Sequence, residues 1–126
     1  MKRYLMAAIA ALSLTACGSS PDGVVRDFYT HLAEGNTTKA AELISPQLRS
    51  SWGGKLDAAL LDVSTKIAKC DGIKKLEVEQ DKERSTDILR VFKITMTMKS
   101  DDQKCGVKND TIKTFKNDGK WHIHLG

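Results

Sequence analysis

The fold of this chain is decided within residues 55–79, KLDAALLDVSTKIAKCDGIKKLEVE, where the spacing of the apolar side chains changes. In the first part they recur every three to four positions, beginning with Leu56 and Leu60, which is the period of a helix with one buried face. After Gly72 they alternate with charged residues, as in Leu76 and Val78, which is the period of a strand. The stretch therefore predicts a helix at 55–69 followed by a strand.

Two further helices are predicted on the N-terminal side of this stretch. Ser20 offers a cap and Pro21 a first helical residue, and the apolar residues that follow keep helical spacing as far as Gly35. A second, short helix is capped within residues 36–38 and ends before Pro46, because proline disfavours helical backbone in the residue before it. The segment from there to Gly54 shows no period, and we expect it to be irregular.

Three more strands are predicted on the C-terminal side. Apolar residues alternate strictly from Phe92 to Met98, while residues 88–91 break the alternation, which indicates a bulge or burial on both faces. A third strand at 107–116 and a last strand at 120–125 flank Asn-Asp-Gly, a strong hairpin turn. We therefore expect an α+β domain in which three N-terminal helices pack on a four-stranded antiparallel sheet, a meander with the helices on one face.

The N-terminal residues have the layout of an export signal. Lys2 and Arg3 precede a short apolar run, and the run ends in Leu14-Thr15-Ala16-Cys17, which resembles the lipobox of bacterial lipoproteins. The resemblance implies that residues 1–16 are removed and that Cys17 carries lipid. We expect residues 17–21 to be the lipidated cysteine and a short tether, and 22–126 to be the folded domain.

The same motif gives a predicted location. Gly18 and Ser19 follow the cysteine, and an Asp, which in such lipoproteins often marks retention at the inner membrane, does not. We expect a lipid-anchored protein of the cell envelope, at the outer membrane and facing the periplasm. We expect the lipid on Cys17 to hold the protein at the membrane through several acyl chains, because one chain alone binds only marginally.

The charge of the predicted mature chain argues against a nucleic-acid partner. The whole chain has 20 Lys and Arg against 16 Asp and Glu, and removing residues 1–16 takes away two of the cations, which leaves a net charge of +2. The remaining lysines are interleaved with acids, whereas a nucleic-acid surface concentrates positive charge on one face. The sequence leaves the oligomeric state unspecified.

Two cysteines remain after Cys17 is assigned to lipid. Cys70 comes just before the first strand and Cys105 just before the third, and in a meander these two positions lie at the same end of the sheet. In an oxidising compartment we expect them to form a disulfide, which closes a loop of about 35 residues and stabilises the fold by roughly 3–4 kcal/mol in the chain-entropy model. Reduced buried thiols and a metal site are the alternatives.

The order of elements and several short motifs resemble the nuclear transport factor 2-like superfamily, in which a curved sheet forms a cone around a long helix. The closest resemblance is to its uncharacterised single-domain bacterial lipoproteins. The matching segments are VVRDFY at 24–29, LAEGN at 32–36, KAAELI at 39–44 and NDGKW at 117–121. The resemblance implies a cone-like α+β fold over most of the mature chain.

Some members of this superfamily are isomerases or dehydratases with an acid or base inside the cone. In the ketosteroid isomerase branch a catalytic tyrosine lies on the first helix, about seven residues before the glycine that ends it. Here that position is Phe28, which has no hydroxyl to stabilise an oxyanion. Tyr29 lies one step round the helix, where we expect its hydroxyl to be in water. The departure argues against that chemistry.

We therefore predict a non-enzymatic binding or interaction module that needs no cofactor and whose partner is a small apolar molecule or another envelope protein. Two alternatives stay open: a small isomerase-like or hydrolytic enzyme that uses the cone interior, and a metal-binding protein. His122 and His124 share one face of the last strand and are weak candidates for metal ligands. The candidate pocket residues, for which core packing is the alternative, are Phe28, Tyr29, Trp52, Phe92, Met96 and Trp121.

Overall fold

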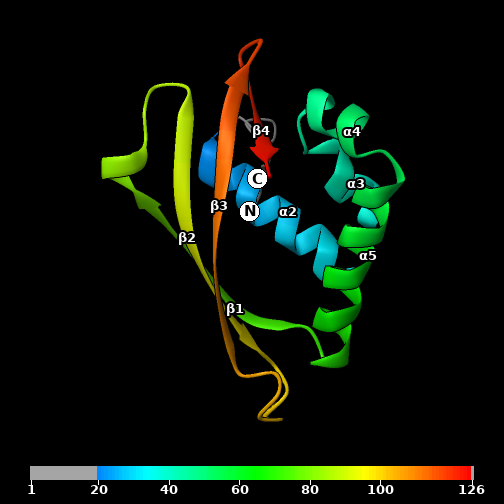
Figure 1. Cartoon of the computed structure of the whole chain (residues 1–126). Coiled ribbons are helices and arrows are strands. Elements are labelled where there is room, and N and C mark those ends of the chain that lie inside the picture. Colours follow the sequence, from blue (N-terminus) through cyan, green and yellow to red (C-terminus); the bar gives the residue numbers. More distant parts are fainter. Residues whose placement is uncertain (1–19, 126) are drawn as a thin grey trace, which may run out of the picture.

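The structure, a computed structural model, describes residues 20–125. The predicted signal peptide, Cys17 and most of the tether lie outside the described residues. Four helices come first and four strands follow, joined by one short 3-10 turn, η3 (Lys82–Arg84) (Figure 1). No helix within 20–125 has the length and apolar character needed to cross a membrane. The predicted order, helices followed by an antiparallel sheet, is confirmed.

The first helix, α2 (Pro21–Ala33), begins where the sequence placed its cap. The Ser20 side chain accepts a hydrogen bond from the Gly23 amide at 3.2 Å, and Pro21 is the first helical residue. Pro21 therefore belongs to the helix and not to the tether predicted at 17–21. One face of α2 is buried in the core. Its buried residues are Val24, Val25, Phe28, Tyr29 and Leu32.

The next two expected helices are also present. Helix α3 (Thr37–Glu42) is capped by Asn36, whose side chain accepts from the Lys39 amide. Helix α5 (Gly54–Lys69) presents Leu56, Leu60 and Ile67 to the core. It is attached to α2 through the buried Ser64 hydroxyl, which donates to the Leu32 carbonyl at 2.7 Å. This bond fixes α5 against the helix that the sheet encloses.

One helix was not expected. Residues 46–52 were predicted to be irregular, but they form the short helix α4 (Pro46–Trp52). The Ser45 hydroxyl accepts from the Leu48 amide at 3.4 Å, and proline follows at the first helical position. These are ordinary start signals for a helix. None of its side chains is buried, so the segment lacks the apolar period on which the sequence prediction depended.

The sheet is the predicted meander. Its strands β1 (Ile73–Asp81), β2 (Leu89–Met98), β3 (Val107–Asn117) and β4 (Lys120–His124) lie in the order β1-β2-β3-β4, and all pairs are antiparallel. The break in alternation at 88–91 is burial on both faces, since Val91 and Phe92 are both buried while the pairing of β2 with β3 continues without a shift.

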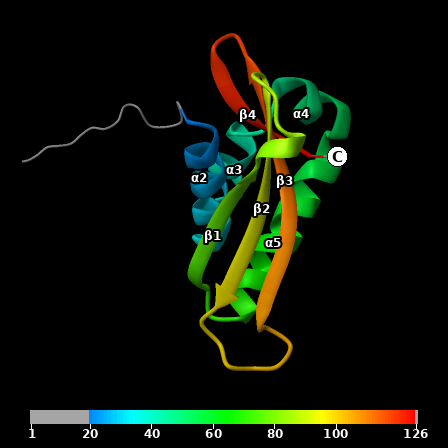
Figure 2. The same cartoon turned by 90° about the vertical axis from the view of Figure 1, so that its left-hand side faces the viewer.

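The helices lie on one side of the sheet, and the strands stand in front of α5 when the molecule is turned (Figures 1 and 2). Strand β4 is half the length of β3 and pairs only with its second half, from Lys113 to Asn117. The first half of β3, residues 107–112, pairs with β2 on one side only. Beside this half of β3 the sheet therefore has three strands instead of four, and α5 approaches it there.

The other end of the sheet is closed by the segment between α3 and α4. The Ser45 amide donates to the Ile123 carbonyl at 3.1 Å, and the Ile123 amide donates to the Leu43 carbonyl at 2.7 Å. Ile44 and Ile123 are fully buried at this junction. Peptide groups at the edge of β4 are thus paired within the chain, which protects that edge from joining another sheet.

Candidate functional site

The inner face of the sheet and α2 enclose a packed core. Phe28 and Phe92 are buried there, and the rings of Phe28 and Tyr29 meet edge to face with centroids 5.4 Å apart. Trp121 is buried under two cations, with the Arg90 guanidinium 5.3 Å from its ring centre and Lys116 at 5.8 Å. These four aromatic residues, predicted as candidate pocket lining, fill the interior instead.

The two remaining lining candidates lie elsewhere. Trp52, at the end of α4, is 36% exposed and lines none of the three depressions described below. Met96 is nearly buried on the inner face of β2 and does line one of them. Of the six candidate residues, only Met96 lines one of the three depressions described here.

Tyr29 brings the one phenol hydroxyl into this core. The sequence placed its hydroxyl in water, but the residue is only 4% exposed. Burial raises the pKa of the Tyr29 phenol well above its usual range, and the charge of Asp110 and a hydrogen bond to that carboxylate raise it further. The correction has a simple cause: α2 is enclosed on this side by β3, which supplies an acceptor for the hydroxyl. Tyr29 is therefore a neutral donor bound to Asp110.

A cleft of about 560 Å³ lies between the second half of α5 and the sheet. It is in the size range of small-molecule sites. Val63 and Ile67 of α5 form one wall, and Met96 and Met98 of β2 form the other. The Cys70–Cys105 disulfide adds a third apolar surface, so the inside of the cleft is made of aliphatic and sulfur-containing side chains.

The border of this cleft is charged, and the charge is mostly positive. Lys66 and Lys69 come from α5, Lys104 from the loop between β2 and β3, and Lys108 from the start of β3. Asp102 is the only acidic residue of the lining. The cleft thus combines an apolar interior with four ammonium groups at its edge.

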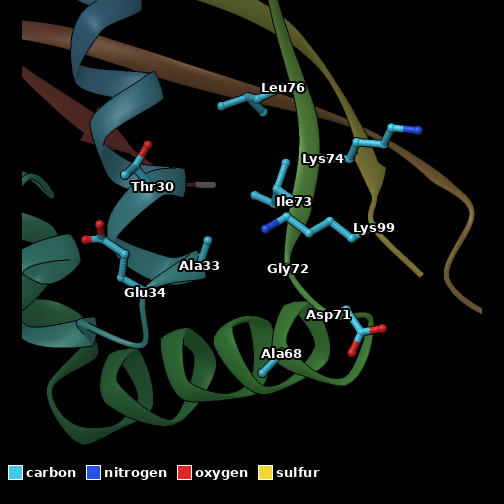
Figure 3. A pocket seen from close by; sticks show the side chains of 10 residues that line it. All are labelled: Thr30, Ala33, Glu34, Ala68, Asp71, Gly72, Ile73, Lys74, Leu76 and Lys99. Carbon is cyan, nitrogen blue, oxygen red and sulfur yellow. The ribbon is translucent and has the colours of Figure 1, made fainter.

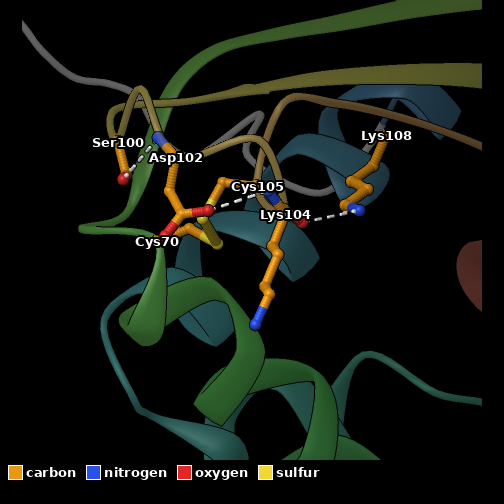
Figure 4. The surroundings of a disulfide bond; sticks show 6 residues. All are labelled: Cys70, Ser100, Asp102, Lys104, Cys105 and Lys108. Carbon is orange, nitrogen blue, oxygen red and sulfur yellow. Dashed lines mark hydrogen bonds between the residues drawn. A yellow bond between two sulfur atoms is a disulfide. The ribbon is translucent and has the colours of Figure 1, made fainter.

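The disulfide holds the two sides of the cleft together (Figure 4). Its Cα atoms are 5.6 Å apart, and the predicted pairing of Cys70 with Cys105 is confirmed. Two backbone hydrogen bonds add to it: the Ser100 amide donates to the Cys70 carbonyl and the Lys99 amide to the Gly72 carbonyl, both at 3.0 Å. The loop that carries Lys104 is therefore fixed to the end of α5.

Asp102 stabilises the same loop and does not face the lysine side chains as an ion pair. Its carboxylate accepts from the Lys104 amide at 2.9 Å, and its own amide donates to the Ser100 hydroxyl at 3.1 Å. In Figure 4 the Lys104 side chain extends from this loop toward α5, while Lys108 turns its amine to the Lys104 carbonyl. The loop presents cations to the cleft and keeps its carboxylate in the turn.

Two other depressions have a different character. One, of about 690 Å³, lies between the end of α2 and the start of β1, and in Figure 3 Ile73 and Leu76 point into it while Glu34 and Asp71 lie toward its ends. Another, of about 520 Å³, lies on the opposite face of the sheet and is bordered by Glu79, Lys93 and polar side chains. Both mix the two signs of charge, and although Ile73 and Leu76 line the first one, neither is as apolar as the cleft beside α5.

His122 and His124 lie on the side of β4 opposite the buried Trp121 and Ile123, beside Lys113 and Phe115 of β3. Partial burial lowers the pKa of His122, and the nearby charges of Arg49 and Lys120 lower it further. Positive neighbours disfavour a bound cation as well. Within residues 20–125, no three side chains of the metal-binding types come together.

The residues of the cleft were mostly not predicted. Lysines are common on surfaces, and nothing in their spacing set Lys66, Lys69, Lys104 and Lys108 apart. One signal was available: a disulfide between Cys70 and Cys105 must bring the preceding residues, Lys69 and Lys104, to the same place. The predicted pairing thus already implies two neighbouring cations beside the disulfide.

Comparison with known proteins supports the fold. No family model matches the chain, and no curated protein matches it. Among solved structures it is similar to the crystal structure of a "Putative NTF2-like transpeptidase" from Campylobacter jejuni, where NTF2 denotes nuclear transport factor 2. The two are 15% identical, with a TM-score of 0.67 over 85% of this chain and 99% of that one. The chain therefore has the nuclear transport factor 2-like fold that its motifs resemble.

Proposed function

We propose that this protein is a lipid-anchored, non-enzymatic binding module of the cell envelope and that its ligand site is the cleft between α5 and the sheet. The observation that carries the proposal is the lining of that cleft, in which Val63, Ile67, Met96 and Met98 border about 560 Å³ of accessible space. Methionine side chains are flexible and adapt to irregular apolar ligands. The rest of the interior is packed with its own side chains, so a ligand has no second apolar site of this kind among the three depressions.

Enzymatic chemistry has little support in the described residues. Acyl transfer, the activity in the structural neighbour's name, needs a nucleophile activated by a base. The buried hydroxyls of Ser45 and Ser64 are engaged with backbone groups, and Cys70 and Cys105 are joined to each other. Tyr29 donates its one proton to Asp110 and lines none of the depressions. We therefore favour binding over catalysis.

The anchor is proposed from the motif at Cys17. Mass spectrometry of the protein purified from bacterial membranes tests it directly, because lipidation adds acyl mass to the peptide that begins with this cysteine. We expect the Cys17→Ser variant to lose the added mass and to keep residues 1–16 uncleaved. Absence of acyl mass on the Cys17 peptide of the unaltered protein would contradict the anchor.

The binding site is tested by filling it. Val63 borders the cleft, and Leu61 lies on the same helix with 60% of its surface exposed and does not border it. We expect Val63→Trp to abolish binding of the neutral apolar dye N-phenyl-1-naphthylamine, measured by fluorescence, whereas Leu61→Trp preserves it. Thermal unfolding of both variants checks that each is folded. Equal dye binding by the two folded variants, or none by the unaltered protein, would overturn the proposed site.

A further inference from the structure

The lysines at the edge of the cleft indicate the charge of its ligand, whereas the apolar interior indicates only that part of the ligand is apolar. Lys66 already has a partner, the Asp62 carboxylate at 3.0 Å. Lys69, Lys104 and Lys108 have no carboxylate within ion-pair distance in the part of the chain that the structure describes. Three uncompensated cations therefore surround one apolar opening.

The positions of these cations are fixed by the fold. Lys69 ends α5, while across the cleft Lys104 lies in the loop before β3 and Lys108 near the start of β3, so the opening has positive charge on two opposite sides. The disulfide and the backbone hydrogen bonds beside it keep those sides together. Positive charges that border one opening repel one another, and an anion bound between them relieves that repulsion.

We propose that the cleft binds an anionic amphiphile with a single apolar chain, whose head is held by Lys69, Lys104 and Lys108 and whose chain lies against Ile67, Met96 and Met98. The inference rests on the function proposed above and specifies its ligand class. A carboxylate, a phosphate monoester or a sulfate head complements the excess of positive charge in this lining, where four lysines outnumber the single Asp102. The half-open, apolar interior accommodates a chain, whereas a bare inorganic anion would leave it empty.

The head is tested by comparing two ligands of equal chain length. We expect dodecanoate to bind more tightly than dodecanol, by roughly tenfold at low salt, and this ratio to shrink as the ionic strength rises. Displacement of the naphthylamine dye measures both affinities. Equal affinity of the acid and the alcohol would overturn the anionic head and leave the apolar site standing. Failure of both would remove the site itself, so the two outcomes are distinguishable.

The lysines are tested by neutralising them together. In the triple variant Lys69→Gln, Lys104→Gln, Lys108→Gln we expect the affinity for dodecanoate to fall about tenfold and that for dodecanol to stay the same. The matched control, Lys39→Gln, Lys74→Gln, Lys93→Gln, removes the same net charge away from the cleft. A similar loss in both triple variants would assign the effect to overall charge and overturn the proposed head site.

The source of the anion is tested with vesicles. The same lysines would also attract an anionic membrane surface, which presents two-chain phospholipid heads in place of a free single-chain molecule. We expect dodecanoate to bind in solution and vesicles of phosphatidylglycerol not to sediment the Cys17→Ser protein. Sedimentation that requires Lys69, Lys104 and Lys108, with no dodecanoate binding, would overturn the cleft proposal in favour of a membrane-facing surface.

Discussion

The Tyr29 hydroxyl on α2 is hydrogen-bonded to the Asp110 carboxylate on β3 and joins the enclosed helix to the half of the sheet that β4 does not cover. The hydroxyl is buried, while Asp110 lies at the exposed side. Replacing Tyr29 with Phe removes the bond without opening a cavity. We expect Tyr29→Phe to lower the free energy of unfolding by about 1–2 kcal/mol at pH 7, measured with urea. No change would mean that the hydroxyl contributes nothing there.

The same pair predicts a pH dependence. The phenol ionises near pH 10 in the unfolded chain and at higher pH in the folded one, so above pH 10 the unfolded state binds fewer protons and stability falls as pH rises. Phe does not ionise. The difference in free energy of unfolding between the unaltered protein and Tyr29→Phe should therefore shrink by about 1.4 kcal/mol between pH 9 and pH 11. A difference that stays constant would show that Tyr29 ionises normally.

The disulfide should be worth more than any single contact. The bond between Cys70 and Cys105 closes a segment with a sequence separation of 35. We expect the double variant Cys70→Ser, Cys105→Ser to lose about 3–4 kcal/mol of stability in urea unfolding. Reduction of the unaltered protein provides the control and should cause a similar loss. A much smaller loss in both cases would show that the backbone bonds of Ser100 and Lys99 suffice.

Ser64 tests the contact between α2 and α5. Its hydroxyl donates to the Leu32 carbonyl inside the core, whereas the neighbouring Thr65 is exposed. Ser64→Ala should therefore destabilise the protein by about 1–2 kcal/mol, because the buried carbonyl loses its side-chain partner. Thr65→Ala should stay within about 0.5 kcal/mol of the unaltered protein. Equal effects in a urea titration would argue against a structural role for this bond.

His122 should titrate below the usual histidine range. Burial is the main cause of its lowered pKa, and the charge of Arg49 is the next. The folded state thus takes up a proton less readily than the unfolded state, and this residue makes stability fall as pH drops below about 6.5. We expect the pKa measured by NMR to rise in Arg49→Gln and to stay unchanged in Arg26→Gln, an exposed arginine on α2. The reverse order would contradict the assigned cause.

Much of this fold follows from side-chain period. The change of spacing between Ile67 and Leu76 places the last helix and the first strand correctly, and the Asn-Asp-Gly turn at 117–119 places the final hairpin. Helix α4 is not predicted by this pattern, because it buries no side chain and so has no apolar period. The local signals at Ser45 and Pro46 are ambiguous, because they fit the end of α3 as well as the start of α4.

The site was less predictable for a physical reason. A cleft is a gap between elements, and its lining depends on how far the elements stand apart. Aromatic residues such as Phe28 and Trp121 attract attention as pocket candidates, but their large apolar area is buried most effectively in the core. The lysines at 104 and 108 become part of a site only in the folded chain, where the disulfide and the short β4 place them opposite α5.

The measurement that tests the central claim most directly is a methyl NMR titration of the Cys17→Ser chain. Its four methionines are Met1, Met6, Met96 and Met98, and the last two lie in the cleft. With dodecanoate we expect saturable shifts of the Met96 and Met98 methyl signals, assigned through Met→Leu variants, and their loss in Val63→Trp. Unchanged Met96 and Met98 signals, with or without shifts at Met1 and Met6, would contradict ligand binding between α5 and the sheet.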